Sequence, residues 1–239
     1  MIDTHAHLDM LEDAAAAVER AREAGVTRIV TIGMHDAVEL ADRFADVHAA
    51  VGYHPHQAGE DNDLEELREL LRHPKAVAVG EIGLDYFRDY APHDRQQRLF
   101  AAQLDIAAET GKPVVIHTRA ADDDTVAALR EFDGTVVLHC FSSPHVLPVA
   151  LERNWYVSFA GNVTYKNATD LRLAAAQVPE DRILAETDCP YLAPQPVRGK
   201  TNEPSYVVHT LDVLAQVRRA DAQELAARID ANASACFGL

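Results

Sequence analysis

Lysine is scarce in this sequence, whereas acidic residues are abundant. Only four of the 22 basic residues are lysines, against 38 Asp and Glu, and the formal net charge is −16. A charge of this sign repels polyanions at long range, so a grip on duplex nucleic acid through many Lys and Arg contacts is not expected. An acid-rich, lysine-poor composition favours a halophilic-like acidic surface, because high salt screens the repulsion between like charges.

Membrane spans, a secretion signal and a cysteine framework are also missing. No apolar run approaches the roughly 20 residues that a membrane-spanning helix needs. The N-terminus lacks the basic-then-apolar pattern of a signal peptide. The three cysteines (Cys140, Cys189 and Cys236) are odd in number and widely spaced, which suits a reducing compartment. We therefore expect a cytoplasmic protein without membrane contact, and no obligate protein partner is evident.

Eight short apolar runs alternate with longer segments of helical period. The runs cover 1–8, 28–33, 49–55, 76–83, 113–118, 135–140, 155–161 and 182–188. The segments between them include two helix candidates: 11–25, where Gly25 supplies the C-terminal stop, and 63–73, where Asp63 is the N-cap. Two final helices are expected near 203–218 and 221–237. We expect one α/β domain over 1–239, a single (β/α)8 TIM-type barrel of parallel strands with an additional C-terminal helix.

A doubly wound open sheet would give a similar alternation of strands and helices. A dinucleotide-binding sheet of that kind has a Gly-rich phosphate-binding loop after its first strand, and no such loop follows the first apolar run in this sequence. The closed barrel is therefore the favoured architecture.

Most of the runs end in a residue that can bind a metal ion or carry a proton. These residues are His5, His7, His54, Glu81, His117, His139 and Asp188. In a parallel barrel the carboxyl ends of the strands meet at one face, where barrel enzymes build their active sites. A His or Glu inside an apolar run would otherwise be buried at a cost in free energy. We therefore expect these side chains to converge.

His5 and His7 stand two residues apart on the first run. Side chains alternate along a strand, so both imidazoles point to the same side and can hold one divalent ion. A single buried histidine is more often a core residue satisfied by a neighbour. Here four histidines (His5, His7, His117 and His139) and the two carboxylates lie at corresponding run ends, which favours a metal centre instead.

The number of donors suggests two ions. The expected arrangement is a first ion on His5, His7 and Asp188, a second on His117 and His139, and a bridge formed by Glu81. Two ions about 3.5–4 Å apart can activate a water molecule and clamp the oxygens of a displacement, which implies hydrolysis. Imidazole and carboxylate ligands admit Mg²⁺, Mn²⁺, Zn²⁺, Ni²⁺ or Co²⁺. No Gly-x-Ser-x-Gly nucleophile frame competes with this interpretation.

Eight stretches, in order along almost the whole chain, match one protein family. They are IDTHAHLD (2–9), GYHPH (52–56), GEIGLDY (80–86), PVVIHTR (113–119), LHCFSS (138–143), ETDCPYL (186–192), RGKTNEP (198–204) and NASACFGL (232–239). The sequence resembles the TatD-type metal-dependent deoxyribonucleases of the amidohydrolase-like barrel superfamily. The combination of GEIGLDY, ETDCPYL and RGKTNEP is highly specific. The resemblance implies a TIM-type barrel, a two-metal site and nuclease activity on DNA, single-stranded or at 3′ ends.

The resemblance also implies roles for individual residues. The family's metal ligands match His5, His7, Glu81, His117, His139 and Asp188. Asp188, which is also placed to orient or deprotonate the attacking water, and the bridging Glu81 are the expected catalytic residues. His54 and His56 match positions beside the substrate phosphate, although they could instead only shape the turn around Pro55. Tyr53 and Ser143 depart from the family pattern, which concerns the fit of the substrate rather than metal binding.

Further polar and charged residues lie near the proposed ligands in the sequence. Arg119 is a candidate anchor for a substrate phosphate, but it could simply pair with Glu186 or another acid. Arg198 and Lys200 could meet a backbone phosphate. Glu186 is expected to support the site because it lies on the same side of its strand as Asp188. The residues that follow, Asn202 and Glu203, are expected to cap the next helix.

Two other functions are compatible with the same residues. A small-molecule amidohydrolase, lactonase or phosphoesterase would use the same dinuclear site with a different pocket. A non-catalytic barrel with a structural metal is less favoured, because structural zinc sites use four protein ligands and leave no open position.

Overall fold

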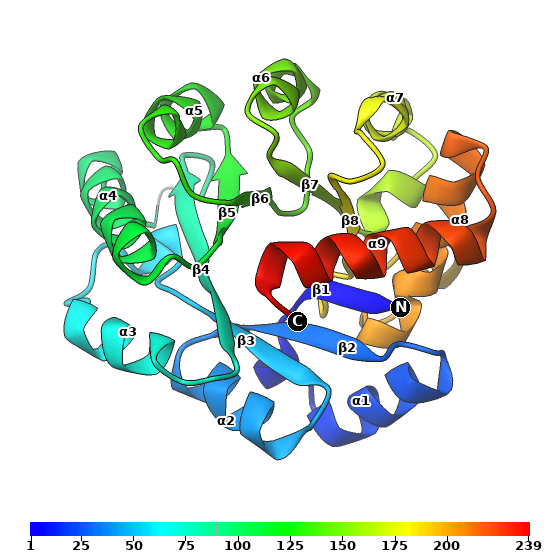
Figure 1. The fold of residues 1–239 in the computed structure, drawn as a ribbon, viewed down its shortest axis with the longest axis horizontal. Helices are drawn as coiled ribbons and strands as arrows, with labels where there is room; N and C mark the ends of the chain where they lie inside the picture. Colours follow the sequence, from blue (N-terminus) through cyan, green and yellow to red (C-terminus); the bar gives the residue numbers. More distant parts are fainter. Residues whose placement is uncertain (89) are drawn as a thin grey trace.

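Eight parallel strands form a nearly closed barrel in a computed structural model that describes residues 1–88 and 90–239 (Figure 1). Neighbouring strands follow the order of the sequence. The strands are β1 (Ile2–Ala6), β2 (Arg28–Gly33), β3 (Val47–Val51), β4 (Ala76–Asp85), β5 (Val114–Arg119), β6 (Val136–Leu138), β7 (Tyr156–Phe159) and β8 (Ile183–Ala185). The helices are α1 (Ala14–Glu23), α2 (His35–Arg43), α3 (Leu64–Leu71), α4 (His93–Thr110), α5 (Asp122–Arg130), α6 (Leu147–Glu152), α7 (Thr169–Gln177), α8 (Val207–Arg218) and α9 (Ala222–Phe237).

The barrel closes between β1 and β8 through the residues that follow β8. The backbone N–H of His7 donates to the carbonyl of Cys189 at 2.8 Å, and the N–H of Asp188 donates to the carbonyl of His5 at 2.9 Å. The Thr4 hydroxyl donates to the carbonyl of Ala185 at 3.1 Å. Three of the expected metal ligands therefore belong to the seam that joins the first strand to the last.

Helix α9 covers the end of the barrel from which the strands start, next to β1 and β8 (Figure 1). The amide of Asn232 in α9 donates to the carbonyl of Ile183 at the beginning of β8. The opposite end, where the strands finish, is left to loops. Because α9 covers only the end where the strands start, the candidate site lies at the other end, beside the loops that follow the strands.

Local sequence signals account for the helix ends. The carboxylates of Asp13, Asp63 and Asp221 accept backbone N–H groups at the first turns of α1, α3 and α9. Gly111 and Gly238 follow α4 and α9 in the left-handed conformation, with φ of 66° and 70°. The three carboxylates satisfy backbone N–H groups that the helices leave unpaired.

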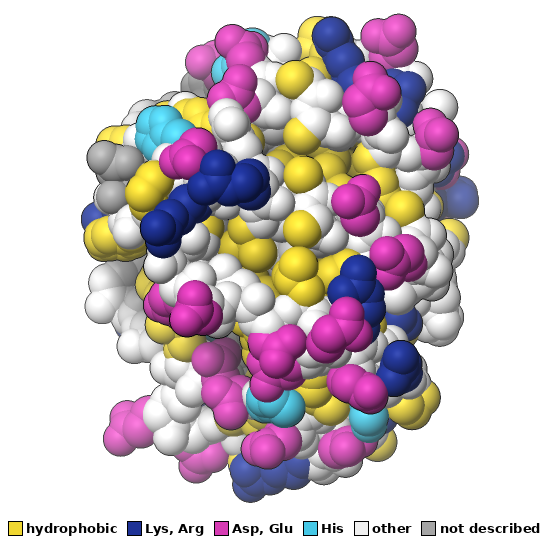
Figure 2. Space-filling model, turned by 90° about the vertical axis from the view of Figure 1, so that its left-hand side faces the viewer, with side chains coloured by type: hydrophobic (Ala, Val, Ile, Leu, Met, Phe, Trp, Pro, Cys, Tyr) yellow, Lys and Arg dark blue, Asp and Glu magenta, His cyan; other side chains and the backbone are white. Residues whose placement is uncertain are grey.

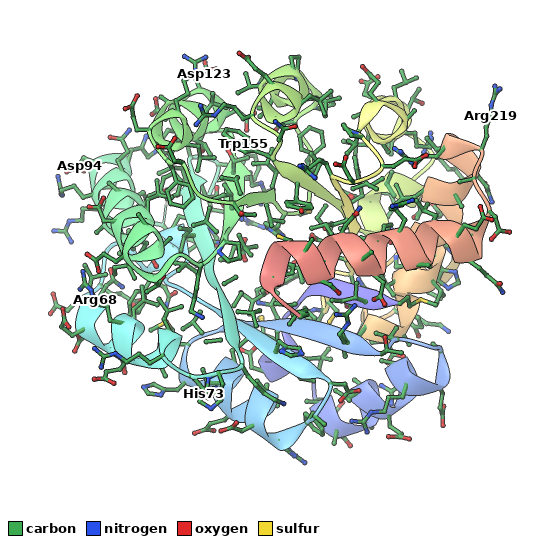
Figure 3. All side chains as sticks on the ribbon, viewed as in Figure 1. Arg68, His73, Asp94, Asp123, Trp155 and Arg219 are labelled. Atoms are coloured by element: carbon green, nitrogen blue, oxygen red, sulfur yellow. The ribbon has the colours of Figure 1, made fainter. Side chains whose placement is uncertain are left out.

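A core of apolar side chains fills the barrel and the layer between strands and helices. All ten residues of β4 are buried, as a sheet covered on both faces requires. Trp155 is buried before β7, whereas Arg68, Asp94, Asp123 and Arg219 lie on the outside of the helical layer (Figure 3). Acidic side chains are scattered, among basic and apolar ones, over the side of the molecule that Figure 2 shows.

The predicted fold class is confirmed, including the additional C-terminal helix. The last three predicted strands are too long, because β6, β7 and β8 span only three or four residues each. The backbone leaves extended geometry just past β6 and β8, with φ of 44° at Cys140 and 56° at Asp188. The predicted helix 203–218 begins only at Val207, because a 3₁₀ turn occupies Pro204–Tyr206.

Within the described residues, no helix is both long and apolar enough to cross a bilayer. All three cysteines are free thiols. The cytoplasmic location stays a prediction.

Candidate metal centre

The candidate site lies where β1, β4, β5, β6 and β8 finish, and β4 supplies its central residue, Glu81. The register between β4 and β5 shifts between Gly80 and Ile82, so a β-bulge sets the direction of the Glu81 side chain. Gly83 follows with φ of 141°, and a Cβ atom there would collide with the carbonyl of His117 on β5. Glycine therefore allows β4 and β5 to approach closely at the point where both carry site residues.

The two carboxylate oxygens of Glu81 face different histidines. Oε1 lies 2.6 Å from Nδ1 of His117 and 2.8 Å from Nε2 of His139. Oε2 lies 3.4 Å from Nε2 of His5 and 3.8 Å from Nε2 of His7. This division between two sides is what a carboxylate that bridges two ions requires.

His5, His7 and Asp188 form one side of the cluster. The Nε2 atoms of the two imidazoles lie 3.3 Å apart. Oδ1 of Asp188 lies 3.5 Å from Nε2 of His7 and 3.8 Å from Nε2 of His5. The two histidines on the first strand and the carboxylate after the last strand are held together by the seam that closes the barrel.

Three groups of donor atoms, each within 4.8 Å of one another, could hold an ion. They are His5, His7 and Glu81; His5, His139 and Asp188; and His54, Glu81 and His117. All six predicted ligands appear in these groups. The distribution differs from the expected one, because His139 groups with His5 and Asp188 rather than with His117. The pairing of His117 and His139 on one ion stays a prediction.

His54 enters the cluster as a seventh donor that sequence reasoning assigned to the substrate. Its Nε2 lies 3.4 Å from Nδ1 of His117 and 3.6 Å from Oε1 of Glu81. Its Nδ1 accepts the backbone N–H of His56 at 3.2 Å, which caps the 3₁₀ turn Pro55–Gln57. One ring nitrogen of His54 therefore shapes the turn, while the other faces the site.

Burial and charge oppose each other strongly in this cluster. Burial by itself would raise the pKa of Glu81, but the charges of His139 and His54 outweigh it and hold that pKa well below its usual range. Burial would lower the pKa of His139, but Glu81 and Glu186 raise it well above the ordinary value. Burial and the charge of His139 lower the pKa of His5 to about 4. Metal binding requires neutral imidazoles, so an ion would displace the proton that the raised pKa of His139 favours, whereas the lowered pKa of His5 leaves that ring neutral.

Two further carboxylates orient the imidazoles from behind. Glu186 is fully buried, and its Oε1 lies 3.1 Å from Nδ1 of His139 and accepts the N–H of Cys140 at 2.8 Å. Oδ2 of Asp85 lies 3.2 Å from Nε2 of His117 and 2.8 Å from Nε2 of His56. The contacts with His139 and His117 direct the other ring nitrogen of each towards Glu81. The expected supporting position of Glu186 is the one observed, although its role stays a proposal.

The loop that carries Asp188 is fastened at two points. The carboxylate of Asp3 accepts the backbone N–H and the hydroxyl of Thr187, at 2.9 and 2.5 Å. The amide of Asn202 donates to the carbonyls of Thr187 and Tyr191, at 2.8 and 2.6 Å. Asp188 therefore stands between two anchored residues, which holds its left-handed backbone in place.

The expected caps at Asn202 and Glu203 are wrong. Glu203 precedes the 3₁₀ turn Pro204–Tyr206 without a side-chain capping bond, and it forms an ion pair with Arg20 of α1 at 2.5 Å. Asn202 is fully buried, and its amide serves the carbonyls of the loop after β8 instead.

Arg119 and Arg198 both lie over aromatic rings. The Cζ atom of Arg119 is 4.1 Å from the ring centre of Phe87, and that of Arg198 is 3.9 Å from the ring centre of Tyr165. Within the residues that the structure describes, Arg119 does not pair with Glu186, whose carboxylate contacts His139 and Cys140. Pairing of Arg119 with another acid stays a prediction. Arg119 is exposed, and its role as a phosphate anchor stays a prediction.

Asp3 and Asp85 are the residues that sequence reasoning missed. Both lie within quoted motifs, IDTHAHLD and GEIGLDY, and both are fully buried. A carboxylate inside an apolar strand needs partners, and that signal could have singled them out. Their contacts with residues distant in the sequence, Thr187 for Asp3 and the two histidines for Asp85, form only in the fold.

The donor set fits divalent ions. Imidazole nitrogens and carboxylate oxygens converge, most of them buried, and Glu81 offers one oxygen to each side. Nδ1 of His5 and Oε2 of Glu186 are buried without a hydrogen-bond partner among the described residues. A site of this composition can bind a phosphate or carbonyl oxygen next to a bound water, which is the chemistry of hydrolysis.

Comparison with known proteins gives a consistent picture. A model of the family described as TatD related DNase matches residues 2–238. The chain is 39% identical over 251 residues to the uncharacterized metal-dependent hydrolase YabD of Bacillus subtilis, covering 99% of this chain and 98% of that protein. It is 35% identical over 244 residues to the 3′-5′ ssDNA/RNA exonuclease TatD of Edwardsiella piscicida, covering 95% and 94%. The crystal structure of YJJV, a TatD homologue from Escherichia coli, superposes with a TM-score of 0.94 at 32% identity, covering 100% and 98% of the two chains.

Proposed function

The chain belongs to the TatD-related DNase family of metal-dependent hydrolases, and from this premise we propose that it is a deoxyribonuclease that shortens single-stranded DNA from the 3′ end. The observation that carries the proposal is the Glu81 carboxylate, whose two oxygens face separate sets of donors. The names of relatives such as the exonuclease of Edwardsiella piscicida favour a phosphodiester as the bond that is cleaved. We further propose that residues 1–239 form one domain and act in the cytoplasm.

Two divalent ions would be held by the six predicted ligands, His5, His7, Glu81, His117, His139 and Asp188. When bound, such ions supply positive charge to the phosphate and lower the pKa of a water molecule. Which of Mg²⁺, Mn²⁺, Zn²⁺, Ni²⁺ or Co²⁺ is used depends on availability as much as on these ligands. His54 lies close enough to Glu81 and His117 to contact either an ion or a phosphate oxygen.

The side chains of the protein would divide the remaining work. Asp188, partly open to solvent, accepts a proton from the attacking water. His56 and Arg119 donate to phosphate oxygens from the rim of the site. Glu186 and Asp85 hold His139 and His117 in fixed orientations, so the imidazoles need no reorganisation during the reaction.

The net charge of −16 is compatible with this substrate. Two divalent ions add about four positive charges at the centre itself, where the scissile phosphate would lie. An exonuclease that holds a few nucleotides needs far fewer basic contacts than a duplex binder. Weak affinity and a marked dependence of turnover on salt follow from this balance.

The test is metal-dependent shortening of single-stranded DNA labelled at its 5′ end. With added Mg²⁺ or Mn²⁺ we expect a ladder of products, and Asp188→Asn and Glu81→Gln should lower the rate by roughly 100-fold or more. Asp105→Asn on the outer surface of α4 is the matched control and should keep the full rate.

Two outcomes would replace the proposal. Turnover of cyclic amides, lactones or small phosphoesters without shortening of DNA would make the protein a small-molecule hydrolase with the same centre. Full activity of Asp188→Asn would show that this carboxylate takes no part in the reaction and would revive a structural role for the metal.

A further inference from the structure

Large apolar side chains are exposed around the candidate metal centre and rarely elsewhere. In the part of the chain that the structure describes, five such side chains are exposed, and four of them (Met10, Phe87, Tyr90 and Tyr191) are between 49% and 64% accessible. These four follow β1, β4 or β8 at the end of the barrel where the site lies. The fifth, Leu173, is on helix α7. Apolar groups gathered at one rim mark a binding surface rather than chance exposure.

Two of the four form a pair beside His7. The ring centres of Tyr191 and His7 are 6.0 Å apart with the rings nearly perpendicular, and the Tyr191 hydroxyl donates to Sδ of Met10 at 3.5 Å. The backbone N–H of Tyr191 donates to the carbonyl of Asp188 at 2.9 Å, so the ring is attached directly to the loop that carries that ligand.

The other two lie beside the residues expected to contact phosphate. The ring centres of Tyr90 and His56 are 4.7 Å apart, and the guanidinium of Arg119 lies over the face of Phe87. His56 and Arg119 both belong to the β3–β5 side of the barrel. We call Tyr191 with Met10 the β8 platform and Phe87 with Tyr90 the β4 platform.

The two platforms lie across the centre from each other. In an eight-stranded barrel whose strands follow the order of the sequence, β4 and β8 are four strands apart and therefore opposite (Figure 1). Glu81, which lies on β4, and Asp188, which follows β8, occupy the space between them. A chain that runs from one platform to the other would pass over the metal ligands.

We propose that these platforms stack the bases on either side of the scissile phosphate of a single-stranded DNA. This inference rests on the proposed nuclease function and specifies how the substrate is held. Aromatic rings are sequence-tolerant partners for unpaired bases, and a guanidinium over a ring extends the stacking surface. The bases of a duplex are already paired and stacked, so the platforms select single strands. Stacking also compensates for the shortage of lysines, since it adds affinity without positive charge.

The test measures DNA binding without cleavage. An oligothymidylate of about eight nucleotides carrying a fluorophore is titrated with protein in Ca²⁺ or EDTA, and its anisotropy is recorded. An abasic oligomer of the same length has the same phosphates and no bases. We expect the wild-type protein to bind the thymidylate more tightly than the abasic oligomer. Phe87→Ala and Tyr191→Ala should each weaken thymidylate binding about 5- to 100-fold, and Tyr191→Ala should leave abasic binding unchanged.

Conservative variants and a distant one complete the design. Phe87→Tyr and Tyr191→Phe keep a ring and should retain the wild-type affinity, which excludes misfolding as the cause of the loss. Leu173→Ala removes an equally exposed apolar side chain away from the site and should bind both oligomers as the wild type does. The slope of affinity against salt should stay the same in Tyr191→Ala, because Tyr191 does not pack against His56 or Arg119, the residues assigned to the phosphate.

Base stacking and DNA cleavage can fail independently of each other. If the wild-type protein shortens DNA but binds thymidylate and abasic oligomers equally, or if the alanine variants bind normally, the platforms do not stack bases. Absence of any oligomer binding by the wild type would overturn the inference as well. If binding depends on the rings but no metal restores cleavage, the stacking surface stands and the nuclease function falls.

Discussion

Replacing Asn202 by Ala should separate the stability of the fold from the binding of metal. The Asn202 amide is fully buried and donates to the carbonyls of Thr187 and Tyr191, and its oxygen accepts the N–H of Glu203 at 3.0 Å. Those two carbonyls flank Asp188 on the loop after β8. The substitution leaves three backbone groups without these partners.

Each lost hydrogen bond is worth about 1 kcal/mol, so the free energy of unfolding should fall by about 3 kcal/mol. For a chain of this size that corresponds to a melting temperature lower by about 6–12 °C. The loop should also hold Asp188 less well, and metal affinity should fall by about 10- to 100-fold, the usual effect of losing a residue that positions a ligand.

Asn232 provides a matched control at the other end of the barrel. Its amide donates to the carbonyls of Glu180 and Ile183, both at 2.8 Å, far from the metal ligands. Asn232→Ala should lower the free energy of unfolding by about 2 kcal/mol and leave metal affinity unchanged. Urea unfolding and calorimetric titration with Mn²⁺ measure the two quantities. Equal losses of metal affinity in both variants, or none in Asn202→Ala, would show that Asn202 does not position the loop that carries Asp188.

Three further predictions concern the backbone, pH and salt. Gly83→Ala should destabilise the fold by roughly 3 kcal/mol or more and weaken metal binding, because its Cβ would displace His117, whereas Gly111→Ala has open space and should cost about 1 kcal/mol in urea unfolding. Burial alone would raise the pKa of Glu203, but the hydrogen bonds from Arg20 and Ser205 outweigh burial, so the pKa in the folded protein lies below 4.5. The wild type should therefore have a larger free energy of unfolding than Glu203→Gln, by at most about 1 kcal/mol. This difference should be fully present above pH 4.5 and should disappear as the pH falls through the pKa of Glu203 in the folded protein, as urea unfolding at a series of pH values would show. The melting temperature should rise from low salt to molar KCl because of the net charge of −16, and an unchanged value would exclude salt adaptation.

The barrel could be predicted because its strands are buried on both faces. Runs such as 76–83 and 28–33 are largely apolar, and the segments between them have a helical period and recognisable caps such as Asp63. The ends of the short strands could not be predicted in the same way. The run 182–188 continues past β8 while the backbone turns into the left-handed conformation at Asp188, and no local pattern announces that turn.

The ligands of the candidate site could be predicted from the sequence, but their grouping could not. The six expected ligands could be chosen because a His or Glu at the end of an apolar run is costly to bury unless it binds a partner. Their grouping could not, because it depends on how the imidazoles of His139 and His54 are rotated by Glu186 and by the turn at Pro55. The role of Asn202 could not be predicted either, since the two carbonyls that its amide reaches lie 11 and 15 positions away in the chain.

Anomalous diffraction from crystals grown with Mn²⁺ would locate the metal ions directly. We expect two peaks at the carboxyl end of the barrel, one next to each oxygen of Glu81, with His5 and His7 at one and His117 at the other. Peaks elsewhere, or ordered side chains at Glu81 with no peak beside them, would contradict this expectation.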